Sequence, residues 1–396
     1  MQDIQNAQAS TNGKKYRIAT SQDVTLGWEH LALSSRSFFP VIEQCPENVR
    51  NQYMILYNVF RQFDSIEDCS SDFDLRISLL DIAYNYMVKD VDISPVFSEL
   101  NGLKESEMNL LRSQLILSRL TREFFPVRTD ARKSFREQLE NMKDGMIEFL
   151  KRAKDGIHVQ TIEDLNEYCD YVAGTVGKVL TDIINDTLDL NKNDEMYPLA
   201  IKFGRGLQKT NIVLDVAEDE EAGRLYMPQD IFRTYYDYYI KNSLFSLNNQ
   251  NVINVARMNT LNTVILDAAK DLESAFDYTL YVPTTTIDYE KHWNFYLLPT
   301  LTAFESLKLA YGNGQVLKER VRVSKIENQK IQAFLSEVYQ SKNKKAALMK
   351  VKKHYSEHFD FLAARYEPLE ILVNYSTQND PEQAISENPE GIKQTA

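Results

Sequence analysis

No linker-like segment interrupts this chain between residues 20 and 375, and this continuity is what most constrains its fold. In stretches such as 107–125 and 261–276, apolar residues recur at three- and four-residue spacing, the period of an α-helix. Alternating, strand-like runs are scarce, and 13 Gly and 11 Pro among 396 residues leave few turn signals. The pattern therefore predicts one large all-α domain over residues 19–375, between disordered polar segments at 1–18 and 376–396.

The charge balance and the cysteines exclude several classes of protein. The formal net charge is −12, and the basic stripe typical of nucleic-acid-binding proteins is missing, so we expect no nucleic-acid partner. Cys45, Cys69 and Cys169 lack metal-site spacing, which indicates free thiols in a reducing compartment. The first 15 residues hold no apolar signal core, and no run of 18 apolar residues occurs. We expect a cytoplasmic protein, soluble or peripheral to a membrane, without a transmembrane anchor.

Two short acidic clusters, D-S-I-E-D and D-V-A-E-D, carry the strongest chemical signal. Each places two aspartates four residues apart on one helix face, Asp64 with Asp68 and Asp215 with Asp219. If the two helices faced each other, each pair of carboxylates about 4 Å apart would cost about 4 kcal/mol at an effective dielectric constant of about 20. Hard cations such as Mg²⁺ offset such repulsion, since they take oxygen ligands and share their shell with substrate phosphate. The pattern predicts a diphosphate site built on Mg²⁺.

A solvated acidic face is the simpler interpretation of one such cluster. The residues before both clusters argue against it, because 57–63 and 207–214 are largely apolar, with an occasional Arg, Lys or amide. Three arginines that suit phosphate also lie nearby or upstream, Arg36, Arg61 and Arg224. Their planar guanidinium groups match phosphate oxygens, although any one of them alone is typical of a protein surface.

Glycines inside a predicted helix mark a third segment, residues 168–180. Gly174 and Gly177 each cost a helix about 1 kcal/mol relative to alanine, which indicates either close contact with another helix or a cavity with backbone at its wall. Tyr168 and Tyr171 lie three residues apart and would share one helix face. A tyrosine hydroxyl placed there could stabilise or deprotonate a cation.

Residues 57–68, 168–180 and 207–228, in this order, resemble the squalene and phytoene synthase family of head-to-head prenyl transferases, and the resemblance runs over about residues 34–325. Residues 294–299 are similar to the segment that lines the second-step pocket of the squalene-forming members, and the chain length also favours those members. The resemblance implies a single large helical bundle around a central apolar channel, the isoprenoid synthase fold.

The activity that the resemblance implies is a Mg²⁺-dependent head-to-head condensation of two farnesyl diphosphates to presqualene diphosphate, followed by reduction to squalene with NADPH. It implies no obligate protein partner, and it allows contact with a membrane surface for release of the product. Eukaryotic members usually end in a membrane-anchoring helix, whereas this chain ends in a polar tail. We expect the soluble, bacterial type, and the alternative is a native chain that is longer at its C-terminus.

The resemblance also assigns roles to individual residues. The residues implied to hold Mg²⁺ are Asp64, Glu67, Asp68, Asp215 and Asp219. The residues implied to bind the substrate diphosphates are Arg36, Tyr57, Arg61, Gln208, Asn211 and Arg224. The residues implied to contact NADPH are Arg36, Arg61, Asn211, Arg322 and Lys325. The residues implied in catalysis are Tyr168, Tyr171 and Phe295, the last as an aromatic face that shields a carbocation.

Two departures from the family pattern leave an alternative open. Leu214 stands where many members have an arginine, so a charged phosphate ligand is lost. Ser324 stands where an arginine is expected in the basic segment 316–325 that resembles part of the NADPH site. The alternative is a transferase of the same family that stops at presqualene diphosphate or makes phytoene-type products without NADPH. A non-catalytic helical lipid-binding protein is less consistent with two intact sets of mutually repelling aspartates.

Overall fold

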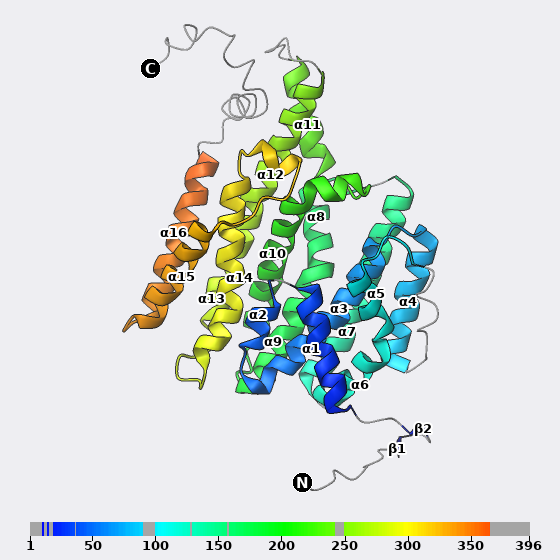
Figure 1. The fold of residues 1–396 in the computed structure, drawn as a ribbon. Coiled ribbons are helices and arrows are strands. Elements are labelled where there is room, and N and C mark those ends of the chain that lie inside the picture. The colour runs from blue at the N-terminus through cyan, green and yellow to red at the C-terminus, as the bar shows by residue number, and fades with distance from the viewer. Residues whose placement is uncertain are drawn as a thin grey trace. The chain divides into compact units, whose positions relative to one another are not determined.

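The computed structural model describes residues 10–11, 14–15, 19–35, 37–89, 100–126, 129–156, 158–241 and 249–364. Its regular structure is helical apart from two short strands, β1 (Ser10–Thr11) and β2 (Lys14–Lys15), which pair antiparallel (Figure 1). The predicted all-α fold is thus confirmed for the described residues. Apart from β1 and β2, the predicted polar tails at 1–18 and 376–396 lie outside the described residues.

The chain divides into two compact units, each built from separate stretches of sequence. The first unit draws on residues 1–156, 170–204 and 278–299, and the second on residues 157–169, 205–277 and 300–396. The chain passes between them within helices as well as within loops, because α10 (Asn193–Glu221), α13 (Ser274–Thr279) and α14 (Tyr289–Ala310) each contribute residues to both. The predicted domain boundaries stay a prediction.

Besides its parts of α10, α13 and α14, the first unit contains nine helical segments. They are α1 (Ser21–Ser34), α2 (Phe39–Glu43), α3 (Glu47–Asp68), α4 (Phe73–Lys89), α5 (Glu105–Arg112), α6 (Gln114–Phe124), α7 (Asp130–Lys154), the π-helical turn η2 (Asp170–Gly174) and α9 (Thr175–Leu188). This count refers to the described residues. Helix α3 contacts α1, α4, α6, α7 and α9, so it runs through the core of this unit.

Helix α3 carries its acidic cluster on a well-anchored last turn. Val59, Phe63 and Ile66 are fully buried, and their spacing of four and three residues is the helical period. Burying each such side chain contributes about 1.5–3 kcal/mol, so the last turn is held by packing as well as by backbone hydrogen bonds. The polar residues between these positions are therefore presented in fixed directions.

The glycines of segment 168–180 lie where backbones approach closely. A Cβ atom on Gly177 would be 2.6 Å from the carbonyl oxygen of Ala200, and one on Gly204 would be 2.6 Å from that of Ala173. Both distances are far below normal van der Waals contact, so α9 and its flanking turn can pack on α10 only with glycine at these places. Close helix contact is therefore the correct interpretation for Gly177, whereas Gly174 faces side-chain atoms of Ile201 and Asp170.

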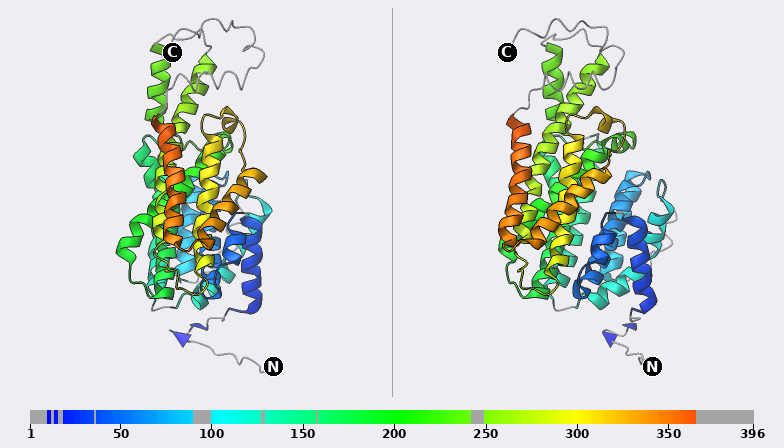
Figure 2. Two further views of the ribbon diagram at one scale, coloured as in Figure 1. Left: turned by 90° about the vertical axis from the view of Figure 1, so that its left-hand side faces the viewer. Right: turned by 60° about the vertical axis from the view of Figure 1, so that its left-hand side comes forward.

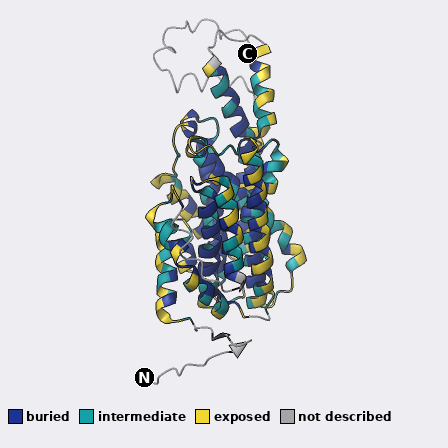
Figure 3. Ribbon diagram, turned by 90° about the vertical axis from the view of Figure 1, so that its right-hand side faces the viewer, coloured by how far each residue is buried: buried dark blue, intermediate teal, exposed yellow. Residues whose placement is uncertain are grey.

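The second unit adds α8 (Ile162–Cys169), α11 (Gln229–Lys241), α12 (Asn249–Leu272), the 3₁₀ turn η3 (Gly314–Leu317), α15 (Lys325–Gln340) and α16 (Lys344–Ala364). Helices α15 and α16 lie side by side, and α12 contacts both α11 and α16 (Figure 2). Phe304 of α14 stacks on Tyr355 of α16 with ring centroids 4.6 Å apart. Buried residues follow one side of most helices and exposed residues the other (Figure 3), as the helical period predicts.

Candidate active site

The first acidic cluster forms the C-terminal end of α3. Glu67 is buried, whereas the side chain of Asp64 is 33% exposed. The pKa of Asp64 is raised to about 7, mainly by burial; Arg61 opposes this rise and Asp68, one turn away, adds to it. Negative charge is also unfavourable at the C-terminal end of a helix dipole. A bound cation would offset the burial of the Asp64 carboxylate, its repulsion by Asp68 and the unfavourable helix dipole. The oxygen donors of this cluster therefore fit a hard divalent ion.

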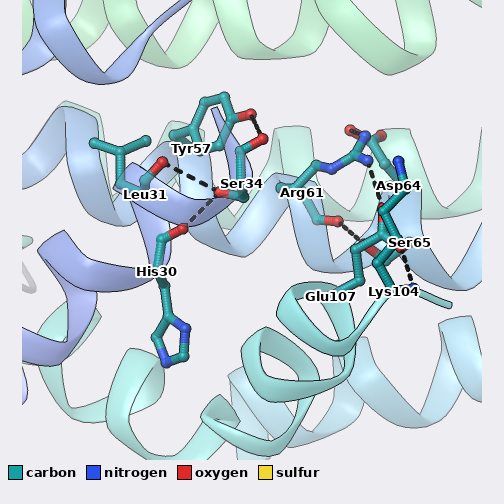
Figure 4. Close-up of polar contacts among 9 residues, drawn as sticks. All are labelled: His30, Leu31, Ser34, Tyr57, Arg61, Asp64, Ser65, Lys104 and Glu107. Atoms are coloured by element: carbon teal, nitrogen blue, oxygen red, sulfur yellow. Dashed lines mark hydrogen bonds and ion pairs between the residues drawn. The ribbon is translucent and has the colours of Figure 1, made fainter. Parts of the chain in front are cut away.

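Arg61 lies one turn before this cluster and is held by two acidic partners (Figure 4). Its Nη2 donates to Oε1 of Glu107 at 3.0 Å, and its Nη1 lies 3.8 Å from Oδ2 of Asp64. Its Nε is buried and has no hydrogen-bond partner among the described residues. A buried donor without a partner costs about 1–3 kcal/mol, and an anionic ligand would remove that cost.

Glu107, on α5, is a site residue that the sequence analysis missed. Its Oε2 accepts the backbone N–H of Lys104 at 2.9 Å, while its Oε1 holds Arg61 (Figure 4). The signature of a capping box is Ser or Thr three residues before the glutamate, and Lys104 stands at that position. The sequence therefore carries no signal for Glu107 at the start of α5 or for its second contact with Arg61.

Tyr57 lies on α3 one turn before Arg61. Its hydroxyl donates to the carbonyl oxygen of Ser34 at 3.4 Å, and the Ser34 hydroxyl donates to the carbonyl oxygen of His30 at 2.7 Å (Figure 4). Burial raises the pKa of Tyr57, so its hydroxyl stays protonated and can donate at neutral pH. Arg36, which we expect to bind diphosphate and NADPH, lies outside the described residues.

The second acidic cluster lies near the end of α10, and arginines from other segments of the second unit contact it. Arg224 Nη2 donates to Oδ1 of Asp219 at 2.8 Å, and Arg320 Nη1 donates to Oδ1 of Asp215. Arg257 of α12 pairs with Glu220, the residue after Asp219. The sequence analysis named Arg224 but missed Arg320, because the contact of Arg320 depends on the path of the chain. Glu220 lies outside the cluster of residues 215–219, so Arg257 is a neighbour of the site and not part of it.

Lys209 fixes the rotation of α10. It is completely buried, and its ammonium group donates to Asp267 and, at 2.7 Å, to Oδ2 of Asp271, both on α12. With Lys209 turned inward, Gln208 is half-buried and Asn211 is exposed. The spacing of positions 208, 211, 215 and 219 places these predicted ligands along one helix face.

Tyr168 and Tyr171 make separate contacts. Tyr168, at the end of α8, stacks on Tyr226 with ring centroids 4.8 Å apart, and the two hydroxyl oxygens lie 3.0 Å apart. Tyr171 lies in η2, and its ring occupies the space that a side chain on Gly145 of α7 would need. The π-helical turn changes the angular spacing of residues 168 to 171, so the shared face expected from a 3.6-residue period stays a prediction.

Phe295 belongs to a buried aromatic group in the first unit. Its ring lies 4.6 Å from that of Tyr53 and 5.3 Å from that of Tyr296, measured between centroids. The hydroxyl oxygens of Tyr53 and Tyr296 are 3.5 Å apart. Burial raises the pKa of both tyrosines well above the usual range, so both stay neutral. Such a group offers ring faces, without a formal charge, to a cationic ligand.

The segment before α15 carries the last predicted residues. Arg322 and Lys325 are exposed. Ser324 is the N-cap of α15, since its hydroxyl accepts the backbone N–H of Ile326 at 3.1 Å and Glu327 accepts the backbone N–H of Ser324 at 3.0 Å. A serine in place of the expected arginine therefore has a structural reason, the capping box of α15.

No group of three or more His, Cys, Asp or Glu residues converges on a common point within the described ranges. The two acidic clusters belong to different units, the first at the end of α3 and the second on α10. The Mg²⁺ site that joins them thus stays a prediction. In the part of the chain that the structure describes, no helix has the length and apolarity needed to cross a membrane.

Comparisons with known proteins test the resemblance. Residues 31–326 match the family described as squalene/phytoene synthase. The squalene synthase of Cyberlindnera jadinii is 28% identical over 306 residues, which cover 75% of this chain and 64% of that protein. The squalene synthase of Saccharomyces cerevisiae is 28% identical over 322 residues, which cover 78% of this chain and 66% of that protein. The chain thus matches about two thirds of the length of these relatives.

Among solved structures, the complex of TcSQS with the ligand BPH1237 has a TM-score of 0.67 and 24% sequence identity, over 90% of this chain and 98% of that one. This likeness shows a shared fold. The sequence match covers the two acidic clusters, the tyrosine segment and the basic segment before α15. The chain therefore belongs to the squalene/phytoene synthase family.

Proposed function

We propose that this protein is a Mg²⁺-dependent transferase that condenses two farnesyl diphosphates to presqualene diphosphate and reduces it to squalene with NADPH. The observation that carries the proposal is the pairing of two helix-borne acidic clusters with arginines. Asp64 lies beside Arg61, and Asp215 and Asp219 lie beside Arg320 and Arg224. Carboxylates for a divalent cation and guanidinium groups for phosphate oxygens are the two components that a metal-bound diphosphate requires.

Each acidic cluster would hold Mg²⁺ through its carboxylates, with Asp64, Glu67 and Asp68 on α3 and Asp215 and Asp219 on α10. The ion would supply positive charge to the departing diphosphate. Around the diphosphate, the chain itself would supply charged and polar donors: Arg36, Tyr57, Arg61, Gln208, Asn211 and Arg224. The buried Nε of Arg61 supports its place in this set, because it needs an acceptor.

In the first half-reaction, the carbon–oxygen bond of one substrate breaks and diphosphate leaves. The double bond of the second substrate then forms a carbon–carbon bond to the allylic cation. Loss of one proton closes the cyclopropane ring, so two farnesyl diphosphates give presqualene diphosphate, diphosphate and a proton. Tyr168 would relay that proton: its hydroxyl would accept the proton while it donates its own to the Tyr226 hydroxyl 3.0 Å away, and the departing diphosphate would be the final base. Tyr171 would contact the substrates in the same half-reaction.

In the second half-reaction, presqualene diphosphate would lose its diphosphate and the resulting cation would rearrange. NADPH, when bound, would supply the hydride that gives squalene. Phe295 would shield the cation with its ring face, supported by the neutral rings of Tyr53 and Tyr296. Arg322, Lys325 and Asn211 are exposed and so accessible to NADPH phosphate. Arg36 and Arg61 complete the set of residues proposed to contact the cofactor. The rings of Phe295, Tyr53 and Tyr296 would also keep water from the cation.

We also propose that the protein works in the cytoplasm, free or at a membrane surface that receives the product. The three cysteines are free and buried, which suits a reducing compartment. Burial raises the pKa of the Cys45 thiol to about 12, so this thiol stays protonated and unreactive.

A second candidate is a transferase of this family that does not use NADPH. It is favoured by the buried Leu214, which leaves no charged group at that position of α10, and by Ser324, which caps a helix rather than offering a cation. Its product would be presqualene diphosphate or a phytoene-type hydrocarbon.

Product analysis separates the two candidates. Purified protein would be incubated with farnesyl diphosphate and Mg²⁺, with and without NADPH, and the products identified by gas chromatography and mass spectrometry. Squalene that forms only with NADPH would support the full reaction. Presqualene diphosphate, detected as its alcohol in both samples, would restrict the function to condensation.

Variants test the metal assignment. Loss of a residue that only supports a metal ligand typically lowers activity about 10- to 100-fold. Asp64→Asn and Asp215→Asn should each lower turnover by more than this, because they remove proposed ligands themselves. Asp237→Asn, on the exposed surface of α11, is the matched control and should keep full activity. Circular dichroism would verify the fold of all three. Substantial turnover in either cluster variant would reject the assignment.

A further inference from the structure

Leu214 directly precedes Asp215 on α10 and is 6% exposed. An arginine at this position, as many family members have, would place a guanidinium group beside the second acidic cluster. The buried leucine provides only packing. The proposed diphosphate site at the second acidic cluster therefore lacks one of the positive charges that would bind the two phosphoryl groups.

The structure brings another guanidinium group to this place from a distant segment. Arg320 lies in the irregular stretch between η3 and α15, 105 residues after Asp215, and its Nη1 donates to Oδ1 of Asp215. Both ends of this stretch are anchored. Val316 of η3 is fully buried, and Ser324 caps α15. The position of Arg320 is thus a consequence of the local fold.

Two guanidinium groups consequently lie on neighbouring turns of one helix face. Arg320 contacts Asp215 and Arg224 contacts Asp219, and these aspartates are four residues apart, about 6 Å along the helix axis. Arg257 also pairs with a carboxylate of α10, but its partner Glu220 follows Asp219 by one residue and so points about 100° away around the helix. Arg257 therefore provides an internal comparison.

Arg320 has the accessibility and the chemistry to bind an anion while it contacts Asp215. The side chains of Arg320 and Asp215 are 35% and 27% exposed, so a solute can reach both. A guanidinium group has five N–H donors, and one carboxylate engages at most two of them in a bidentate pair. The remaining donors can bind phosphate oxygens without loss of the aspartate contact.

We propose that Arg320 replaces the missing arginine at position 214 and binds the diphosphate of a prenyl substrate at the second acidic cluster. This inference rests on the proposed function. It adds a substrate-binding residue that neither the family pattern nor the sequence spacing assigns. Without substrate, the same guanidinium group neutralises Asp215.

Calorimetric titration of the full chain with inorganic pyrophosphate in excess Mg²⁺ tests the proposal without requiring turnover. Arg320→Ala should weaken pyrophosphate binding by about 10- to 100-fold, the effect of losing one hydrogen bond to a charged group. Arg320→Lys keeps the charge but loses the planar fork and should fall in between. Arg257→Ala should bind pyrophosphate like the unaltered chain. Equal affinity of Arg320→Ala and the unaltered chain, or an equal loss in Arg257→Ala, would overturn the proposal.

A second experiment applies the same titration to variants of position 214, the position whose missing arginine Arg320 is proposed to replace. Leu214→Arg, combined with Arg320→Ala, should recover most of the lost affinity for pyrophosphate, provided that circular dichroism shows an intact fold. If this double variant does not fold, the comparison of Arg320→Ala, Arg320→Lys and Arg257→Ala decides. A folded double variant that recovers no affinity would contradict the replacement of one arginine by the other.

The same titration separates this inference from the proposed function. If the unaltered chain binds pyrophosphate with Mg²⁺ and Arg320→Ala binds it equally well, the role of Arg320 fails while the proposed function stands. If the unaltered chain does not bind pyrophosphate with Mg²⁺, both fail. Adenosine 2′,5′-bisphosphate serves as the comparison ligand for the NADPH phosphates. If Arg320→Ala lost affinity for that ligand alone, Arg320 would belong to a cofactor site and the diphosphate assignment would be wrong.

Discussion

Lys209 of α10 is completely buried, and its Nζ lies 2.7 Å from Oδ2 of Asp271 on α12. Burial is the main cause that raises the pKa of Asp271, and Lys209 is the main group that opposes this rise. Lys209→Met should lower the free energy of unfolding by up to about 3–5 kcal/mol, because it removes the nearer of the two cations beside a buried carboxylate and leaves only Arg205, 3.8 Å away. Urea denaturation followed by circular dichroism would measure the change.

Lys202→Met is the matched control for this prediction. Lys202 lies on the same helix but is exposed, so its replacement should change the free energy of unfolding by less than about 0.5 kcal/mol. The idea that Lys209 fixes the rotation of α10 would be abandoned if the two variants were equally stable.

Gly177→Ala should destabilise the protein. The new Cβ would lie 2.6 Å from the backbone carbonyl oxygen of Ala200, which cannot move without shifting α10. Overpacking of this kind costs about 1–3 kcal/mol, more than the roughly 1 kcal/mol that alanine gains over glycine in a helix. Gly174→Ala meets side-chain atoms only, Ile201 Cγ2 at 3.2 Å and Asp170 Oδ1 at 3.5 Å, and should be close to neutral. Thermal unfolding of both variants would show the difference, and similar melting temperatures would contradict it.

Tyr226→Phe should lower kcat about 2- to 10-fold and leave KM for farnesyl diphosphate unchanged. The variant keeps the ring stacked on Tyr168 but removes the hydroxyl group that lies 3.0 Å from the Tyr168 hydroxyl, and one such hydrogen bond contributes about 0.5–1.5 kcal/mol. Steady-state kinetics would measure the effect.

A double-mutant cycle shows whether Tyr226 acts through Tyr168. Tyr168→Phe should lower kcat further than Tyr226→Phe, and the double variant should be no slower than Tyr168→Phe alone, because the two hydroxyl groups act together. Independent, additive losses would mean that Tyr226 has only a packing role.

Patterns of local origin could be predicted from the sequence. The helical period predicted the all-α fold, and the four-residue spacing predicted that Asp215 and Asp219 lie on one face of α10. The capping box at Ser324 and Glu327 could also have been predicted, since a serine followed three residues later by a glutamate is its signature. The π-helical turn could not, because a 3.6-residue period assumes regular helix across 170–174.

Contacts between distant segments lie beyond sequence patterns. Glu107 reaches Arg61 across 46 residues and Arg320 reaches Asp215 across 105 residues, so both pairs depend on how the helices pack. Charge alone gives no ranking, because the chain has 45 Lys and Arg and 57 Asp and Glu residues. The family resemblance identified Leu214 as a missing charge, and only the folded chain shows Arg320 beside the next residue.

His292 of α14 gives the protein a defined sensitivity to acid. It is 1% exposed, and burial lowers its pKa from 6.5 to about 4, against the opposing influence of Asp288. Between pH 6.5 and 4 the unfolded chain therefore binds more protons at this residue than the folded chain does. The stability that depends on a neutral His292 is fully present above pH 6.5 and is lost as the pH falls towards 4. The loss is on the order of 3 kcal/mol.

Urea denaturation at a series of pH values from 4 to 7 would measure this loss, with His292→Gln as the variant that removes the titrating group. The free energy of unfolding of His292→Gln should fall less steeply between pH 6.5 and 4 than that of the unaltered chain. His354→Gln, on the exposed side of α16, is the control and should leave the slope unchanged. Parallel curves for the unaltered chain and His292→Gln would show that other buried groups cause the acid sensitivity, because only a group with different pKa values in the two states contributes to the slope.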